Sequence, residues 1–282
     1  MNLRSCLPTI LLLLSGTLSA DEAMKKALVF HASFDETFNA DFSGDDPIAY
    51  VRSAKGLDAV PANTGDVRIA PDAGKFGGAL WFPKKGTVRP GFKGEKTLGY
   101  NDRDWSATVS LWLRLNPDED LEPGYCDPIQ IVGDDTKKGF IFLEWSKDHT
   151  PRYFRYAIRP RIELWDPAGV GWEVVPEAKR PMVQLKSAPF SRDSWTHAVF
   201  TLERINGGIG TAAGALYLDG KPRGRIENFD LTFGWDAKAV MLVLGAAYVG
   251  YLDDLAVFNR VLSAEEVEKL FALEGGAASL RP

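Results

Sequence analysis

The stretch from Arg152 to Arg161 mixes arginines with aromatic residues and is the clearest candidate for ligand binding. Its members are Arg152, Tyr153, Phe154, Arg155, Tyr156, Arg159 and Arg161. Aromatic side chains pack against sugar rings, and the guanidinium fork donates paired hydrogen bonds to a carboxylate, sulfate or phosphate. Alternation along a strand places Arg155 and Tyr153 on one side, so we predict that both contact a ligand. An ordinary half-buried strand explains the same pattern.

Three further residues complete the predicted ligand-binding set: Trp165, Trp172 and Glu144. Both tryptophans lie near Pro or Gly, which is typical of exposed loops, although a large Trp side chain also packs in cores. Glu144 is an acid close to the arginine and aromatic cluster.

Carboxylates that could cleave a glycosidic bond must face each other across a groove, one as acid and one as nucleophile or base. The run from Glu144 to Asp148 lacks a suitable spacing, and pairing Glu144 with Glu163 needs a fold that the sequence does not specify. Asp253 and Asp254 are adjacent, and neighbours on a regular strand point to opposite faces. The sequence therefore predicts no catalytic residue.

Histidine and cysteine give no metal or triad pattern. His197 lies beside Trp195 in a strand-like run without a nearby acidic partner, and we expect it to be structural. Cys126 is the one cysteine outside the N-terminal segment, so an exported product would have no internal disulfide. A lone thiol of this kind is more often buried than reactive.

The elements that must position these side chains are short strands rich in β-branched and aromatic residues. We predict strands at 27–34, 67–70, 79–82, 108–115, 128–132, 140–145, 153–158, 195–202, 215–218, 240–244 and 252–258. Asp219-Gly220 predicts a hairpin turn. Ser263 and Glu266 form a capping-box pattern at the start of one amphipathic helix. The strand at 109–115 is apolar on both sides, which indicates one core face and one ligand-facing side.

Six blocks in order resemble one known family. They are FDE at 34–36, GKFGGALWF at 74–82, SATVSLWLRL at 106–115, SWTHAVFTLE at 194–203, GALYLDGKPRG at 214–224 and GYLDDLAVFNRVLSAEE at 250–266. Together they are similar to laminin-G-like jelly rolls of the concanavalin A-like lectin/glucanase superfamily. The resemblance implies an all-β, two-sheet antiparallel jelly-roll sandwich with a short C-terminal helix. We expect one domain over residues 21–274 and a flexible tail over 275–282. The sequence departs from the family between 117 and 189, where it is longer and more aromatic.

The resemblance also implies one structural calcium ion at the edge of the sandwich. Members of the family hold it with a carboxylate of the closing strand and with carbonyls of the opening strand and of the GGAL block. The matching carboxylate here is Asp253, with Asp254 second and Asp35 third. Calcium favours such hard oxygen ligands. Solvated acids at a strand edge are the alternative interpretation.

Export and charge limit the partners. Residues 1–20 have Arg4 before a short apolar run and small residues at the end, so they resemble a signal peptide cleaved after Ala20 or Ser19. The apolar run is shorter than the about 20 residues that span a bilayer. We expect a secreted product, extracellular or periplasmic, without a membrane span. The formal net charge of −5 gives no electrostatic reason to bind nucleic acid.

We therefore expect a non-catalytic jelly-roll domain that binds a polysaccharide, a smaller glycan or another extracellular ligand. A glycoside hydrolase or polysaccharide lyase on the same fold is the first alternative, and a structural interaction module is the second. An acidic pair on the concave face would favour the hydrolase.

Overall fold

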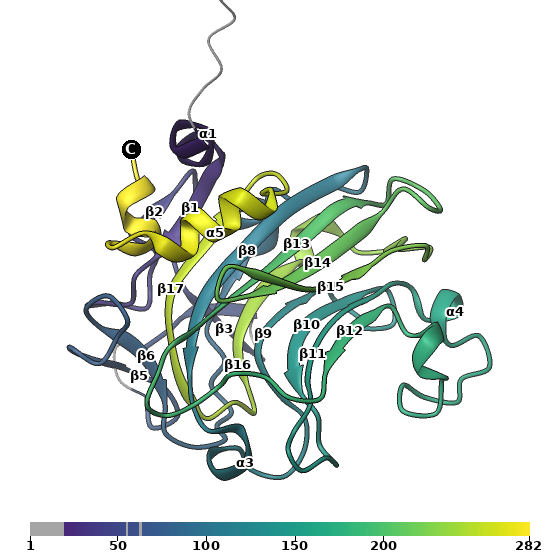
Figure 1. Ribbon diagram of the computed structural model, residues 1–282, viewed down its shortest axis with the longest axis horizontal. Helices are drawn as coiled ribbons and strands as arrows, with labels where there is room; N and C mark the ends of the chain where they lie inside the picture. Colours follow the sequence, from purple (N-terminus) through teal and green to yellow (C-terminus); the bar gives the residue numbers. More distant parts are fainter. Residues whose placement is uncertain (1–19, 55, 62–63) are drawn as a thin grey trace, which may run out of the picture.

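The computed structural model describes residues 20–54, 56–61 and 64–282, and in them two antiparallel sheets pack face to face (Figure 1). Sheet A contains, in spatial order, β15 (Lys221–Ile226), β14 (Ala213–Leu218), β13 (Thr196–Ile205), β8 (Trp105–Arg114), β17 (Gly250–Phe258), β1 (Leu28–Ala32) and β2 (Phe42–Ser43). β6 (Ala79–Phe82) also pairs with β17, and β5 (Arg68–Ala70) pairs with β6. Sheet B contains β12 (Met182–Leu185), β11 (Phe154–Arg159), β10 (Phe140–Trp145), β9 (Cys126–Val132), β16 (Met241–Ala246), β7 (Gly91–Lys93), β3 (Tyr50–Ser53) and β4 (Gly56–Ala59). The predicted all-β sandwich is confirmed.

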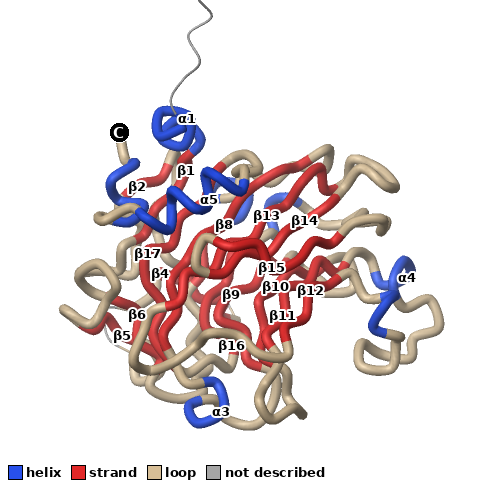
Figure 2. The backbone as a smooth tube through the Cα atoms, in the orientation of Figure 1, coloured by secondary structure: helices blue, strands red, loops and turns tan. Residues whose placement is uncertain are grey.

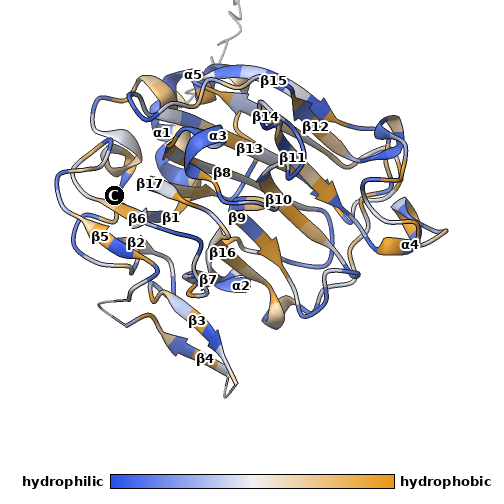
Figure 3. Ribbon diagram, turned by 90° about the horizontal axis from the view of Figure 1, so that it is seen from below, coloured by the Kyte–Doolittle hydropathy of each residue, from blue (hydrophilic) through white to orange (hydrophobic). Residues whose placement is uncertain are grey.

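Helical segments are short and lie outside the two sheets. They are α1 (Ala20–Ala27), α2 (Gly94–Thr97), α3 (Pro117–Asp120), α4 (Ile162–Trp165), α5 (Ala264–Ala272) and the 3-10 turns η1 (Glu177–Lys179), η2 (Ala237–Ala239) and η3 (Gly276–Leu280). The segment joining β11 to β12 contains α4 and stands beside the β12 edge of sheet B (Figure 2). The β3–β4 hairpin projects from the sandwich at the other edge of that sheet (Figure 3). No helix in the part of the chain that the structure describes has the length and apolarity to cross a bilayer.

Every strand predicted from the sequence is present, and β6 and β10 have the predicted bounds. The short strands β2, β3, β4, β7 and β12 were not predicted, and neither was β15. β15 has the sequence KPRGRI and is exposed along most of its length, so it carries no alternating apolar pattern. The hairpin turn is confirmed, because Asp219 and Gly220 both have positive φ, at 52° and 72°.

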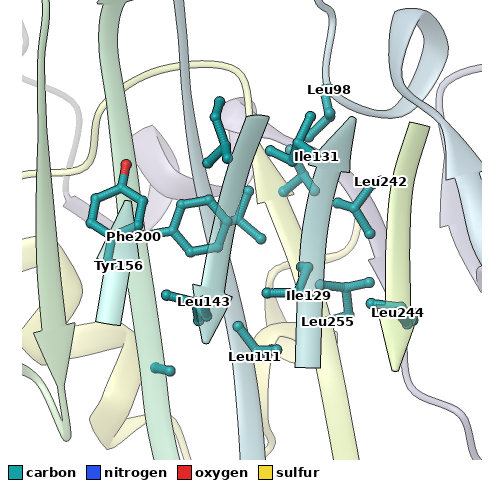
Figure 4. Packing of buried hydrophobic residues seen from close by; sticks show 14 of the residues in the cluster. Leu98, Leu111, Ile129, Ile131, Leu143, Tyr156, Phe200, Leu242, Leu244 and Leu255 are labelled. Atoms are coloured by element: carbon teal, nitrogen blue, oxygen red, sulfur yellow. The ribbon is translucent and has the colours of Figure 1, made fainter. Parts of the chain in front are cut away.

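The main core lies between the sheets, where apolar side chains of both inner faces interdigitate (Figure 4). Leu111 and Leu255 come from sheet A, and Ile131, Leu143 and Leu242 come from sheet B. Burial of these side chains supplies most of the favourable free energy of folding, at about 25 cal/mol per Å² of apolar surface. Cys126, the one cysteine among the described residues, is a buried free thiol, so no disulfide contributes to this part of the chain.

A second, smaller core covers part of the outer face of sheet A, where α5 lies across β8 and β17 (Figure 1). Val267 and Leu270 of α5 pack there with Phe258, and Trp112 of β8 stacks on Phe271 with ring centroids 5.6 Å apart. The strand at 109–115 is therefore apolar on both sides because a helix covers it. The expected ligand-facing side is not present along Trp112. The capping box of Ser263 is confirmed.

The C-terminal residues are packed, whereas the sequence predicted a flexible tail over 275–282. η3 buries Ala277 and Leu280 in the second core, together with Met24 of α1. The glycine and alanine run at 275–278 gave no sequence signal for this packing, because small side chains are weakly apolar although they allow close approach. The predicted signal peptide at 1–20 falls outside the described residues except for Ala20.

Candidate ligand-binding face

The outer face of sheet B carries the arginine of the predicted ligand-binding cluster. On β10 and β11, Leu143 and Tyr156 point into the core, so Glu144 and Arg155 point outward. The register of the two strands places Glu144 directly opposite Arg155. Arg155 Nη1 lies 3.2 Å from Glu144 Oε1, and both side chains are buried. The structure thus brings together two residues that the sequence predicted separately.

Arg155 also fixes the loop between β11 and β12. Its Nη1 lies 2.8 Å from Glu173 Oε1, and its Nε donates to Gln184 Oε1 at 2.7 Å. Tyr125 donates its hydroxyl hydrogen to the same Glu173 oxygen at 2.8 Å. Burial opposes ionisation of Glu173, but hydrogen bonds from Arg155 and Tyr125 outweigh it and lower the pKa of Glu173. Glu173 is therefore the carboxylate that balances the charge of Arg155.

The two predicted loop tryptophans enclose another arginine of β11. The Arg159 guanidinium lies 4.5 Å from the ring centroid of Trp165 and 5.0 Å from that of Trp172. Trp165 is 7% exposed, so the expectation of an exposed loop aromatic is wrong for it, whereas Trp172 is partly exposed. Burial lowers the pKa of Arg159. Arg159 Nε and Trp172 Nε1 are buried without a hydrogen-bond partner among the described residues.

Tyr153, the remaining aromatic of the predicted set, precedes β11 and does not take part in the contacts of Arg159 with the two tryptophans. Its ring stacks on His149 with a centroid distance of 3.8 Å, and its backbone N–H donates to Ser146 Oγ at 3.0 Å. Tyr153 is partly buried. It thus belongs to the turn that leads into β11, while Arg155 belongs to the sheet face.

A second acid, Asp127 of β9, joins Glu144 on this face. Burial raises the pKa of Glu144 to about 8, and repulsion from Asp127 adds to this against the pull of Arg155. Burial likewise raises the pKa of Asp127 to about 7, although the Gln130 hydrogen bond and the charges of Arg89 and Arg159 act in the opposite direction. Two buried carboxyls that interact in this way titrate as a pair.

One oxygen of Asp127 has no hydrogen-bond partner among the described residues. Gln130 Nε2 donates to Asp127 Oδ2 at 2.5 Å, while Oδ1 is buried and accepts no hydrogen bond from the described residues. Asp127 has no signal in the sequence because β9 is irregular there: its register against β10 shifts between the Ile129 and Cys126 pairs. Gln130 could have been found, since it stands between two core isoleucines.

An open groove of about 510 Å³ lies on the outer face of sheet B, and one of its lining residues, Gln130, bonds Asp127. It is lined by Tyr50, Val51, Arg52, Thr87, Val88, Arg89, Gln130, Val132, Met241 and Val243. Apolar floor residues and a few polar rim groups are the usual composition of a ligand site, and the volume lies within the common range of about 300–1,000 Å³. The arginines and Gln130 supply hydrogen-bond donors, and Tyr50 supplies an aromatic ring.

The predicted metal ligands lie on the opposite sheet. Register between β17 and β8 shifts between Asp253 and Ala256, and Asp254 has a positive φ of 50°. This bulge inserts one residue, so Leu252 and Leu255 both reach the main core. Asp253 and Asp254 consequently lie together on the outer side, and the prediction that they point to opposite faces is wrong. Both are buried, so solvated strand-edge acids are excluded as an explanation.

Asp253 and Asp35 hold the loop at residues 74–78 from two sides. Asp253 Oδ2 accepts backbone hydrogen bonds from Lys75 at 2.6 Å and Phe76 at 3.0 Å, and Asp35 Oδ1 accepts one from Gly78 at 2.7 Å. Burial raises the pKa of Asp253 to about 8; the Phe76 hydrogen bond opposes this, and the charge of Asp254 adds to it. Asp254 has other partners, His31 Nε2 at 2.7 Å and the Ala277 N–H at 3.0 Å.

Oxygen atoms converge beside this loop. A methyl group built on Gly74 would lie 1.9 Å from the Gly78 carbonyl oxygen and 2.8 Å from Asp253 Oδ2. A carbonyl and a carboxylate oxygen are the ligand types that calcium favours. No group of three or more His, Cys, Asp or Glu side chains among the described residues is arranged to hold a metal ion, so any ion here would depend on backbone oxygens.

His197 and Cys126 are structural in their surroundings. His197 stacks on Trp112 at 4.7 Å, lies 2.8 Å from Ser110 Oγ through Nε2, and burial lowers its pKa to about 3. Burial raises the pKa of the Cys126 thiol to about 11. A neutral imidazole and a protonated thiol offer no nucleophilic pair.

Comparison with solved structures gives the same fold at low identity. Domain 4 of AbnA, a GH43 extracellular arabinanase from Geobacillus stearothermophilus, in complex with arabinotriose, has a TM-score of 0.50 and 18% identity, covering 87% of this chain and 98% of that one. The botulinum neurotoxin serotype D ligand binding domain in complex with N-acetylneuraminic acid has a TM-score of 0.55 and 12% identity, covering 90% and 52%. Trypanosoma rangeli sialidase has a TM-score of 0.50 and 13% identity, covering 87% and 32%. The chain thus spans about half of the toxin domain and a third of the sialidase.

The search of curated proteins found no match. A family model matches residues 96–268, which is more than half of the chain and includes β8 through most of α5. That match, together with the two packed antiparallel sheets, establishes the relationship that the six sequence blocks indicated: the chain belongs to the concanavalin A-like lectin/glucanases superfamily.

Proposed function

We propose that this chain is a secreted, non-catalytic jelly-roll domain that binds a saccharide on the outer face of sheet B. The observation that carries the proposal is the groove of about 510 Å³ with Tyr50, Arg89 and Gln130 on its walls. An aromatic ring beside several hydrogen-bond donors suits a sugar, which presents both C–H faces and hydroxyl groups. This chain matches nearly the whole length of domain 4 of the arabinanase. That domain was solved in complex with arabinotriose, which supports a saccharide as the ligand class.

The residues predicted from the sequence take two roles in this proposal. Glu144, Arg155 and Trp165 are buried and hold the face in shape, because Arg155 already bonds Glu144, Glu173 and Gln184. Trp172 is partly exposed, and we propose that it contacts the ligand where the β11–β12 loop meets the face. Tyr153 would contact only a ligand that extends past the start of β11.

Glycan-array binding followed by titration of the best glycan tests the proposal. We expect Gln130→Ala and Arg89→Ala each to weaken binding at least tenfold, because each removes donors from the groove wall. Lys137→Ala, an exposed substitution outside the groove, is the matched control and should leave affinity unchanged. Absence of binding to any glycan, or unchanged affinity in both groove variants, would contradict the proposal.

The acidic pair makes a glycoside hydrolase the second candidate. Asp127 and Glu144 lie on neighbouring strands of one face, and each has a raised pKa, as a general acid requires. Glu144 is buried and bonded to Arg155, so this ion pair would have to break before Glu144 could reach a substrate. Release of reducing ends from a bound glycan, lost in Glu144→Gln and in Asp127→Asn, would establish hydrolysis. Binding without product release supports the first candidate.

We also propose one calcium ion held by Asp253 and Asp35 with carbonyl oxygens of the 74–78 loop. The convergence of the Gly78 carbonyl and Asp253 Oδ2 beside Gly74 supports it. When bound, the ion would supply positive charge that lowers the pKa of Asp253 and stabilises the carboxylate form.

A further inference from the structure

A row of alternating charge and aromatic surface crosses the outer face of sheet A. The strand registers place Arg68 of β5 opposite Trp81 of β6, Trp81 opposite Tyr251 of β17, and Tyr251 opposite Arg114 of β8. Trp195, just before β13, continues the row. At about 4.8 Å between strands, the row is about 19 Å long.

The side chains of the row contact one another in order. The Arg68 guanidinium lies 4.1 Å from the Trp81 centroid, and Trp81 stacks on Tyr251 at 5.7 Å with 7° between the ring planes. Arg114 lies 4.5 Å from the Tyr251 centroid and 4.9 Å from that of Trp195. Such contacts hold long side chains in one conformation, so the surface is ordered before any ligand arrives.

A pocket of about 330 Å³ opens beside the centre of this row. Trp81, Leu115, Val249 and Tyr251 form apolar walls, and the charged residues of the lining are Arg114, Arg192 and Asp120. Helix α5 does not cover it, since Phe271 reaches Trp112, two residues before Arg114, and Phe271 does not line the pocket. Its volume is at the small end of the range for ligand sites, which suits one sugar unit and not a long chain.

The charge of the pocket favours an anion. Arg114 donates one hydrogen bond to the Ala73 carbonyl oxygen at 3.1 Å and makes no ion pair with the described residues. Arg192, by contrast, is paired with Asp120 and Glu119. The carboxylate of the lining, Asp120, is thus paired with Arg192. Arg114 brings a partly buried positive charge without an ion-pair partner among the described residues, next to apolar walls. A planar guanidinium matches a carboxylate with two parallel hydrogen bonds.

We propose that this pocket is a second saccharide site, specific for a sugar unit that carries a carboxylate, such as a uronic or sialic acid. The apolar walls contact the C–H face of the ring, and Arg114 binds the carboxylate. The site lies on the sheet opposite the groove of the proposed function and does not depend on it. A chain with one site on each sheet would link two parts of a polysaccharide.

Titration of the full chain with D-glucuronate, N-acetylneuraminate and D-glucose tests this proposal. We expect at least one acid to bind at least tenfold more tightly than glucose, with affinity falling as salt is raised. Arg114→Lys should weaken acid binding at least tenfold, because it keeps the charge and removes the fork. Arg103→Lys, at an exposed arginine outside the row and the pocket, is the matched control and should stay within about twofold.

The groove on sheet B and the pocket on sheet A can be tested independently of each other. Arg89→Ala, which alters the groove on sheet B, should leave acid-sugar binding intact, and Arg114→Lys should leave the groove's glycan affinity intact. Equal affinity for acids and glucose, or no acid binding, overturns the proposal, and so does unchanged acid affinity in a folded Arg114→Lys variant. If Arg114→Lys does not fold, Arg192→Glu at the exposed rim decides, because it adds a carboxylate beside Asp120 and Glu119 and should repel an acid sugar. Unchanged acid affinity in that variant would likewise overturn the proposal.

Discussion

The paired acids Asp127 and Glu144 are the least ordinary residues of the molecule. Both residues are only 5% exposed. Glu144 shares Arg155 with Glu173, and the pKa of Glu173 is lowered. The single positive charge of Arg155 lies next to the carboxyls of Glu144 and Glu173, which favours one ionised and one protonated carboxyl. Glu173 is the more exposed of the two, so Glu173 is the ionised one. Glu144 thus retains a proton near neutral pH because it is the more deeply buried partner.

This arrangement predicts a pH dependence of stability. The folded pKa of Glu144 is raised from 4.5 to about 8. The folded state therefore holds more protons than the unfolded chain between these values, and its free energy of unfolding falls as pH rises through that window. The slope for one such group is at most about 1.4 kcal/mol per pH unit. Stability is fully retained below about pH 4.5 with respect to this group.

Thermal or urea unfolding of Glu144→Gln from pH 5 to 8.5 measures this effect. We expect a flatter dependence than in the unmodified chain, because Gln keeps the shape of the protonated acid and cannot ionise. Glu163→Gln, an exposed acid of α4, should retain the full slope. Parallel slopes in all three proteins would show that Glu144 does not titrate in this window.

At the scale of elements, the loop at residues 74–78 joins three strands of sheet A. It passes between Asp35, which follows β1, and Asp253 of β17, and it leads into β6. Close approach of these backbones leaves no room for a side chain: a methyl group at Gly78 would lie 2.7 Å from the Asp35 carbonyl oxygen and 2.8 Å from that of Phe34. Both contacts are with backbone, which cannot rotate away.

We predict that Gly78→Ala destabilises the protein by about 1–3 kcal/mol, the usual cost of overpacking a close contact. Urea unfolding of the two proteins gives the difference. Gly65→Ala is the matched control, since its methyl group would meet nothing within 4 Å, and it should change stability by less than about 0.5 kcal/mol. A Gly78→Ala variant as stable as Gly65→Ala would mean that the loop relaxes freely.

At the scale of the whole molecule, the proposed calcium ion would act as a clamp on the sandwich edge. Asp35 follows the opening strand and Asp253 belongs to the closing strand, so one ion between them would couple residues more than 200 positions apart in the sequence. A ligand that binds only the folded state raises its stability by RT ln(1 + [L]/Kd), which is about 2.7 kcal/mol at a hundredfold excess over Kd.

The melting temperature with calcium and with a chelator measures this coupling. We expect the chelator to lower it in the unmodified protein and to have no effect in Asp253→Asn. Asp254→Asn is a useful comparison, because Asp254 bonds His31 and Ala277 instead of the loop. If the melting temperature of the unmodified protein is the same with calcium and with the chelator, the proposed calcium site is wrong.

The sequence by itself determined the architecture of this protein. Alternating apolar residues, turn residues such as Asp219-Gly220 and the capping box at Ser263 act over a few neighbours, and each local signal agrees with the two-sheet fold. It also directed attention to residues 117–189, which supply Tyr125, Asp127, Glu144, Arg155 and Glu173 of the face on sheet B.

Only the tertiary structure decided which side chains meet. The bulge at Asp254 reversed the expected orientation of an acidic pair, and the irregular register of β9 brought Asp127 beside Glu144. Burial of Trp165 and packing of the C-terminal residues depend on partners far away in the chain. The row from Arg68 to Trp195 exists because four strands pair in one register, and that register is set by the whole core. Pairing of strands that are far apart in the sequence costs loop entropy and gains burial of apolar surface. Neither quantity can be predicted from a local sequence pattern, so the register of such strands cannot be predicted from it either.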